Sequence, residues 1–342
     1  MAEWLLDKQD VLKCRVHDIE ALGKEEDYQK LMIFFVGVIQ TFGKAVEVRQ
    51  QVIATATIYF KRFYSRNSLK SIDPWLMAPS CLFLASKVEE FAALPHKHLN
   101  TACRNAVAQN YCKCFPDGIY PYRPHDILEC EFILMEALDC CLIVFHPYRS
   151  LVSFCEDLRP QLSGSTDILL QKSWRIINDS LKTDLCLFYP PYMITLGAMQ
   201  VAFLLMAGSA EPNANKASNF NYVNQYGSSS ASASVNPLAV AERWFADLLV
   251  EADQVLGIAR EILNLYNILA KFDETSEILS LLSRMPKPCI NSVPNQGVPV
   301  TSSSSAVRRN VPSPVLMNSS NMQNVQGYGA RGAQPPRINQ GY

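Results

Sequence analysis

The chain has 342 residues, 49% of them hydrophobic, and a formal net charge of −1. This length predicts two domains with sizeable cores, and the near-neutral charge argues against a protein that binds nucleic acid or anionic membranes. The 11 cysteines are scattered singly or in adjacent pairs, and the opening "MAEWLLDKQD" has no secretory signal pattern. We therefore expect free thiols in a reducing compartment rather than disulfides.

Helical periodicity dominates the chain up to about Met285, which predicts an all-α fold. A short N-terminal helix over Leu5–Leu22 precedes five helices, expected at about 28–42, 46–64, 74–91, 97–111 and 124–140. The third of these begins at Pro74, a residue suited to a first helical turn, and is apolar on every side. A helix that is apolar all round is surrounded by protein, so we expect it at the centre of the other four.

The same pattern starts again after "IVFHPYRSL". Five further helices are expected, in "PYRSLVSFCEDL", "DILLQKSWRIINDSLKTDLCLFY", the apolar run opened by Pro190-Pro191, "NPLAVAERWFADLL" and "EADQVLGIAREILNLYNILAKF". The apolar run is too short for a membrane span and contains Gln200, so we interpret it as a buried helix. The two halves thus indicate an internal duplication of a five-helix unit.

These patterns predict an N-terminal helix at 1–26, a first helical domain at 27–143, a second at 144–285 and a tail at 286–342. The tail and an insert at 208–236 are polar and of low complexity, so both are predicted to be disordered. Ser313-Pro314 in the tail fits a site of proline-directed phosphorylation, and an inert Ser-Pro in a flexible tail is the alternative.

Two charged features do not fit an ordinary core helix. The third helix ends on Lys87, Glu89 and Glu90, and acidic residues at a carboxyl end oppose the helix dipole. In the fifth helix, Glu131 lies on an apolar stripe, where a carboxylate is costly unless paired; the stripe consists of Ile127, Leu134 and Leu138. Two explanations remain open: an internal Lys87–Glu131 salt bridge or snorkelling glutamate, and a charged hot spot on an apolar surface that binds another protein.

The segments "MAPSCLFLASKVEEF" and "ILECEFILMEALDCC" resemble the cyclin box, and the two five-helix units match its tandem arrangement. Longer blocks, "RQQVIATATIYFKRFYSRNSLKSIDP", "DCCLIVFHPYRSL", "TDLCLFYPPYMI" and "MPKP", resemble the transcriptional cyclins. The resemblance covers about residues 1–288, except the 208–236 insert and, less clearly, 92–120. It implies two tandem cyclin boxes and a non-catalytic activator of a cyclin-dependent kinase, with no cofactor.

The resemblance also implies a site. In the family, a lysine of the third helix and a glutamate of the fifth form the polar centre of the kinase interface, which here are Lys87 and Glu131. An apolar surround would consist of Leu84, Val88, Cys140 and Leu142. Glu90, with Glu89, would face the activation segment of the kinase and pair with arginines that elsewhere hold a phosphothreonine.

Two absences favour a transcriptional cyclin over a cell-cycle one. The segment "YQKLMIFFVGVIQTF" lacks the arginine and tryptophan of the substrate-docking motif, and no destruction box precedes it. The resemblance then implies the Mediator-associated cyclin-dependent kinase as partner, RNA polymerase II and transcription factors as substrates, and a nuclear location. In the family a groove between the boxes holds a Mediator subunit; here it would include Trp4, Asn178, Asp179 and Tyr266, for which a solvated helix face is the alternative.

Other classes fit the sequence less well. A DNA-binding protein like transcription factor IIB would need a zinc ribbon with CxxC pairs and a basic surface, and neither pattern is present. The pairs His96-x-His98 and Cys112-x-Cys114 predict no metal site, because side chains two apart on a helix diverge by ~200°. No Gly-rich phosphate loop or nucleophile signature points to an enzyme. We expect no direct nucleic-acid or membrane partner.

Overall fold

The computed structural model describes residues 4–91, 94–162, 164–208 and 237–287. The α-helices in these ranges are α1 (Lys8–Leu22), α2 (Glu25–Ala45), α3 (Gln50–Arg66), α4 (Pro74–Val88), α5 (His96–Ala106), α6 (Pro124–Ala137), α7 (Tyr148–Leu162), α8 (Thr166–Ser180), α9 (Leu185–Phe188), α10 (Pro191–Gly208), α11 (Pro237–Ala246), α12 (Ala252–Lys271) and α13 (Glu274–Arg284). A π-helical turn, Val107–Tyr111, and a 3-10 turn, Cys112–Cys114, follow α5. These ranges contain no strand, and the predicted all-α fold with two tandem five-helix units is confirmed.

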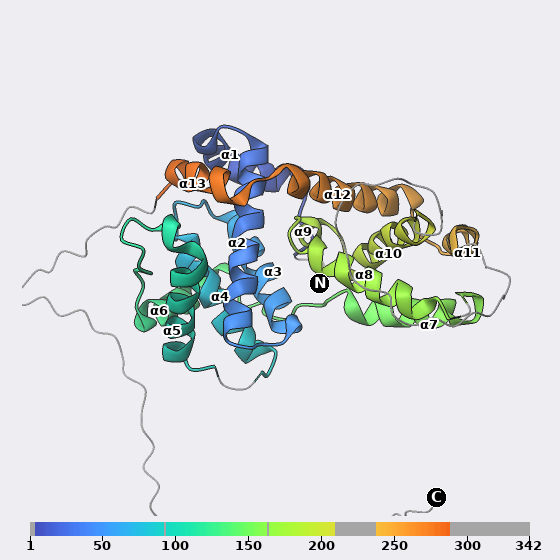
Figure 1. Ribbon diagram of the computed structural model, residues 1–342, viewed down its shortest axis with the longest axis horizontal. Coiled ribbons are helices and arrows are strands. Elements are labelled where there is room, and N and C mark those ends of the chain that lie inside the picture. Colours follow the sequence, from blue (N-terminus) through green and yellow to red (C-terminus); the bar gives the residue numbers. More distant parts are fainter. Residues whose placement is uncertain (1–3, 92–93, 163, 209–236, 288–342) are drawn as a thin grey trace, which may run out of the picture. The chain divides into compact units, whose positions relative to one another are not determined.

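Helix α4 is the central helix of the first unit, as its composition predicts. Asp73 caps its amino end by accepting a hydrogen bond from the Trp75 amide at 3.0 Å, and Pro74 occupies the first turn. Apart from Leu76, every residue from Pro74 to Ser86 is buried. The helix contacts α2, α3, α5 and α6 (Figure 1).

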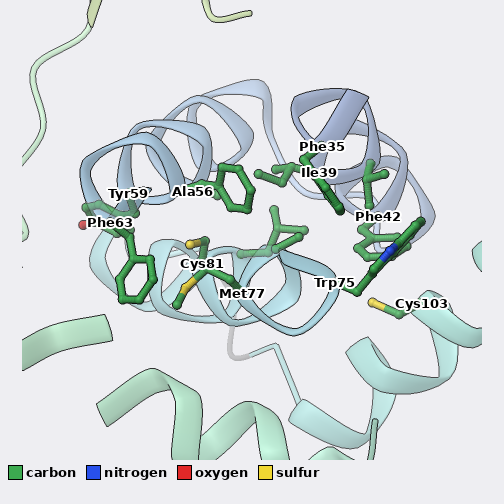
Figure 2. Packing of buried hydrophobic residues seen from close by; sticks show 14 of the residues in the cluster. Phe35, Ile39, Phe42, Ala56, Tyr59, Phe63, Trp75, Met77, Cys81 and Cys103 are labelled. Carbon is green, nitrogen blue, oxygen red and sulfur yellow. The ribbon is translucent and has the colours of Figure 1, made fainter. Parts of the chain in front are cut away.

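The core of this unit is rich in aromatic side chains. Figure 2 shows side chains from α2, α3 and α4 converging between the three helices, with Phe35, Ile39 and Phe42 contributed by α2. Trp75 of α4 packs edge-on against Phe35 at a centroid distance of 5.5 Å. Apolar burial of this extent holds α4 rigidly, so the residues at its carboxyl end are placed by the packing of the whole helix.

Helix α10 has the corresponding role in the second unit, where it contacts α7, α8, α11 and α12. Its approach to α12 is close, because a Cβ added at Gly197 would lie 2.4 Å from Ile258 Cγ2. Of the helices in the described ranges, α10 included, none is long and apolar enough to cross a membrane.

The structure differs from the predicted elements at two places. The segment expected as one helix after Asp167 is two, because the chain turns between Ser180 and Leu185 to form α8 and α9. Helix α13 was not predicted as a separate element. It contacts α2, and its apolar residues join the core of the first unit; they are Ile278, Leu281 and Leu282.

One partly buried carboxylate connects α1 with both units. Asp184, in the turn before α9, accepts from Arg15 Nη1 of α1 at 2.5 Å and from Lys61 Nζ of α3 at 2.9 Å. Burial alone would raise the pKa of Asp184, but the two cations outweigh it and hold the pKa well below its usual range. Asp184 is therefore ionised at neutral pH and binds all three segments together.

The predictions of disorder concern residues that lie, apart from a few at their edges, outside the described ranges. This holds for the 208–236 insert and for the 286–342 tail, which contains Ser313-Pro314. All of them stay predictions.

Candidate protein-binding site

Lys87 and Glu131 form an ion pair where α4 leaves the core. The Lys87 ammonium donates to both carboxylate oxygens of Glu131, each at 2.8 Å, and lies 4.0 Å from the centroid of the Phe83 ring. The Glu131 side chain is 6% exposed, whereas that of Lys87 is 51% exposed. The salt bridge expected as one explanation therefore exists, and it leaves half of the lysine side chain accessible.

The local sequence explains this asymmetry. Three residues that share the face of Glu131 are fully buried: Ile127 and Leu134 in α6, and Leu138, the residue that caps its carboxyl end. Glu131 is consequently held below the surface, where a carboxylate without a partner would be costly. Lys87 lies in the last turn of α4, the first position after a run of buried residues at which a side chain reaches solvent. The pair is rigid on the glutamate side and presented to solvent on the lysine side.

The apolar residues expected around the pair differ in exposure. Val88 and Leu142 are partly buried and Cys140 is exposed, so all three leave some surface accessible to a partner. Three exposed residues were missed in the sequence: Phe132 beside Glu131 is 67% exposed, and Ile143 and Phe145 after Leu142 are 76% and 56% exposed. The sequence carried no signal for Ile143 and Phe145, because "LIVF" is apolar throughout and the alternation of exposure along 142–146 is seen only in the structure.

The prediction for Leu84 is wrong for the free chain. Its side chain is only 2% exposed and belongs to the core of the first unit. The reason is that α4 is enclosed on all sides as far as Ser86, so a residue one turn before Lys87 is still inside the protein. Leu84 packs in the core beneath this surface and is not accessible to a partner.

The end of α4 carries Glu90 in an uncommon backbone conformation. Its φ is +48°, its amide donates to the Lys87 carbonyl, and the Phe91 amide donates to the Ser86 carbonyl. This pair of bonds is the Schellman cap, in which the left-handed position is usually glycine. Glu90 is exposed and makes no ion pair with any residue in the described ranges, so its charge is available to a partner.

Glu89, expected beside Glu90 at the interface, uses its carboxylate inside the protein. One oxygen accepts from Thr55 and the other from Gln51, and the side chain is 12% exposed. It is the C-cap residue of α4, so its side chain returns toward α3 instead of pointing outward. The two adjacent glutamates therefore have different environments.

The four residues expected in a groove do not form one cluster. Asp179 accepts from the Tyr266 hydroxyl at 3.1 Å, and burial together with this carboxylate raises the pKa of Tyr266. Asn178 instead accepts from Tyr148 at 2.8 Å. Trp4 lies under the guanidinium groups of Arg62 and Arg66, at 4.8 and 4.1 Å. The structure thus brings together Asp179 and Tyr266 only.

No group of three potential metal ligands occurs in the described part of the chain, which includes His96, His98, Cys112 and Cys114. The cysteines in these ranges form no disulfide with one another. The described residues thus provide an ion pair, exposed apolar side chains and an exposed acid, a combination that suits the binding of a protein.

Comparison with protein-family models gives two matches. The model "Cyclin, N-terminal domain" matches residues 7–143, and "Cyclin C-terminal domain" matches residues 146–209. Relatives include Cyclin-C of Drosophila melanogaster, 45% identical, with 84% of this chain and 93% of the relative covered.

The chain belongs to the cyclin family. Cyclin-C of Rattus norvegicus is 44% identical, with 84% of this chain and 87% of that protein covered, and Cyclin-C of Caenorhabditis elegans is 30% identical over 84% and 90%. The resemblance carried by the longer sequence blocks is confirmed, and the relatives that share them are named Cyclin-C. Cyclins are regulatory subunits of protein kinases and not catalysts, so this cyclin is a non-catalytic regulator.

Solved structures show the same fold. A structure titled as the CAK complex of Chaetomium thermophilum has a TM-score of 0.56 and 18% identity, with 84% of this cyclin and 86% of that chain covered. A yeast TFIIK complex has a TM-score of 0.51 and 22% identity, with 77% and 96% covered. At these identities the likeness supports the cyclin fold alone.

Proposed function

We propose that this cyclin is the activating subunit of the Mediator-associated cyclin-dependent kinase and acts on transcription by RNA polymerase II in the nucleus. The observation that carries the proposal is the Lys87–Glu131 pair, in which the glutamate is buried and the lysine is half exposed beside the Phe83 ring. A partner that covers the exposed half of the lysine would desolvate this polar anchor, as at an interface hot spot. Support for the kinase class comes from relatives named Cyclin-C, and from fold neighbours whose titles name kinase complexes such as the yeast RNA Pol II CTD kinase CTDK-1.

Activation requires little of the cyclin except a rigid surface. An active kinase keeps the glutamate of its mobile helix turned inward, where it pairs with the lysine that contacts ATP. A partner that binds only this inward state shifts the population of the kinase toward it. The carboxyl end of α4 and the part of α6 around Glu131 suit this role, because both helices pack on a buried core.

Glu90 extends the surface toward the activation segment. A phosphothreonine in that segment normally gathers several arginines, and a carboxylate is the side chain that most closely replaces its charge. Glu90 is exposed, carries its charge at the rim of α4 and has no ion pair within the described residues. We assign to it the pairing with these arginines.

The remaining parts of the proposal concern other Mediator kinase-module subunits. Asp179 and Tyr266 are the members of the expected groove that contact each other, through a hydrogen bond between α8 and α12. We assign to this pair a contact with a Mediator subunit, with Asn178 nearby in the sequence and Trp4 further away along the chain.

The proposal is tested by affinity purification from nuclear extract followed by mass spectrometry. We expect the wild-type chain to co-purify a cyclin-dependent kinase together with Mediator subunits. A Lys87→Met bait should lose the kinase, while an Asp10→Asn bait, altered in an exposed surface pair on α1, should retain it. Recovery of promoter DNA and polymerase without a kinase would contradict the proposal and favour a factor IIB-like role.

A further inference from the structure

A chain of hydrogen bonds joins α3, the end of α4 and the segment that links the two cyclin boxes. Thr55 Oγ1 donates to Glu89 Oε1 at 2.5 Å and lies 2.7 Å from His146 Nε2. Gln51 Nε2 donates to the second oxygen of Glu89. Because a threonine hydroxyl has only one proton and gives it to Glu89, His146 must donate to Thr55 through its Nε2–H.

The side chains of this network are largely buried, and His146 is neutral at neutral pH. Thr55 is fully buried, and the side chains of His146 and Glu89 are 8% and 12% exposed. Burial lowers the pKa of His146; Glu89, 3.8 Å away, raises it, and Arg62 lowers it further. The histidine is therefore neutral and acts as a donor, so each bond in the chain has a defined direction.

Glu89, which accepts the hydrogen bonds of this network, directly precedes Glu90, the residue with the positive φ. Glu89 is the last residue before the left-handed turn, and Glu90 follows at φ +48°. A glutamate pays a strain in this conformation that glycine would not, so its backbone needs support from the surrounding structure. Tying the Glu89 side chain to α3 supplies that support and fixes the direction in which the Glu90 side chain leaves the surface.

We infer that Thr55 is a positioning residue, acting with Gln51 and His146, which holds Glu89 so that Glu90 is presented to the activation segment of the kinase. Glu89 is then an anchor and not a contact to the partner. This role rests on the proposed function, since it concerns the same surface. What it adds is that residues of α3 and of the segment between the boxes determine the orientation of Glu90.

The first test needs no kinase. Hydrogen exchange is measured in the free full-length chain at the amides of Glu90 and Phe91, which donate to the carbonyls of Lys87 and Ser86. Thr55→Val should accelerate exchange at both amides, and Thr55→Ser, which keeps the hydroxyl, should not. Thr57→Val is the matched control, because Thr57 is equally buried on α3 but donates only to the Ile53 carbonyl of its own helix. Unchanged exchange in Thr55→Val would overturn the positioning role.

The second test uses the reconstituted kinase pair and separates binding from activation. Thr55→Val should leave the affinity unchanged and reduce kcat by about tenfold, a size expected when a charged group is misplaced by a fraction of an ångström. The loss should equal that of Glu90→Gln, and the double variant should lose nothing more. If Thr55→Val kept full activity, or if the double variant lost as much as the two single variants together, the positioning role of Thr55 would be wrong, whereas the proposed function would stand. A wild-type chain that activates no kinase would instead refute the proposed function.

Discussion

Three acidic residues of the first cyclin box occupy the left-handed position that follows a helix. Glu47, Glu90 and Asp139 follow α2, α4 and α6, with φ between +48° and +54°. In each case the same two backbone bonds close the helix end, for example Glu47 to the Lys44 carbonyl and Val48 to the Gly43 carbonyl. Glycine is the usual residue here, since other residues lose roughly 1–2 kcal/mol in this conformation. The three positions are therefore strained alike, and of the three only Glu90 is assigned a contact with the kinase.

This comparison yields a prediction for Glu90. Glu90→Gly should raise the free energy of unfolding by up to about 1 kcal/mol, because relief of strain exceeds the extra entropy of glycine in the unfolded chain. The same variant should activate the kinase less. Urea unfolding and a kinase assay measure the two effects.

Glu47→Gly is the matched control, since Glu47 is exposed and has the same cap. It should gain similar stability and keep full activation. If both variants activated equally, the assignment of Glu90 to the activation segment would fail.

The residues of the site were predictable to different degrees. Helical spacing marks Lys87 and Glu131 as unusual, because both interrupt apolar faces, but their role at a kinase interface was implied only by the resemblance to the cyclin box. The difference between Glu89 and Glu90 was not predictable, since it depends on one backbone angle and on Thr55, a residue of another helix. Leu84 was misplaced because spacing gives the face of a helix but not the depth at which that helix leaves the core.

At the scale of elements, two glycines at the packing of α10 and α12 have very different surroundings. Gly197 of α10 lies against Ile258 and the Ala259 amide of α12, so that an added Cβ would come within 2.4 Å of Ile258 Cγ2. Gly257, one residue before Ile258, has nothing within 4 Å of an added Cβ. Both glycines lie in helices, so replacement by alanine raises helix propensity at each, and only Gly197→Ala adds a steric contact.

Gly197→Ala should destabilise the protein by about 1–3 kcal/mol, since overpacking outweighs the gain in helix propensity. Gly257→Ala, which makes no new contact, should stabilise it by roughly 0.5–1 kcal/mol. Thermal unfolding of the two variants provides the comparison. A destabilised Gly257→Ala, or a neutral Gly197→Ala, would contradict the close contact between α10 and α12.

Most helices were predictable because their apolar residues recur with helical spacing over long stretches. The break between α8 and α9 was not, because "NDSLKTDLCLF" contains neither proline nor glycine. The turn is stabilised instead by long-range partners of Asp184 on α1 and α3. Helix α13 was missed for a similar reason, since its apolar face packs on a unit at the other end of the sequence.

At the scale of the whole molecule, Asp184 decides whether α1 and the two cyclin boxes stay together. Lys61 is completely buried and Arg15 nearly so, and both depend on this carboxylate for charge compensation. Asp184→Asn would leave two cations uncompensated, so we expect a loss of about 3–5 kcal/mol. Asp10→Asn, in an exposed pair with Lys13, should change stability by less than ~0.5 kcal/mol in the same chemical-denaturation experiment. If the two variants were equally stable, Asp184 would not be the residue that holds α1 and the two cyclin boxes together.

The same carboxylate gives the protein an acid sensitivity. Its pKa in the folded state is lower than in the unfolded chain, where an aspartate has a pKa of about 3.9. Its contribution is therefore complete above that value and declines as the pH falls through and below it. The free energy of unfolding, measured between neutral pH and about pH 3, should fall more steeply for the wild type than for Asp184→Asn. Parallel curves would contradict an ionised Asp184 in the fold.

The central claim is that a half-exposed lysine locked on a buried glutamate makes this cyclin a kinase activator. The most direct test replaces both charges at once, as Lys87→Met with Glu131→Met, because removing a buried pair completely is often neutral for folding. Binding of the purified kinase is then titrated against wild type and variant, with circular dichroism to confirm the helical fold. We predict an intact fold and a loss of about 2–4 kcal/mol in binding, roughly 30-fold to 1,000-fold in Kd. A folded double variant that binds the kinase as tightly as the wild type would contradict the account.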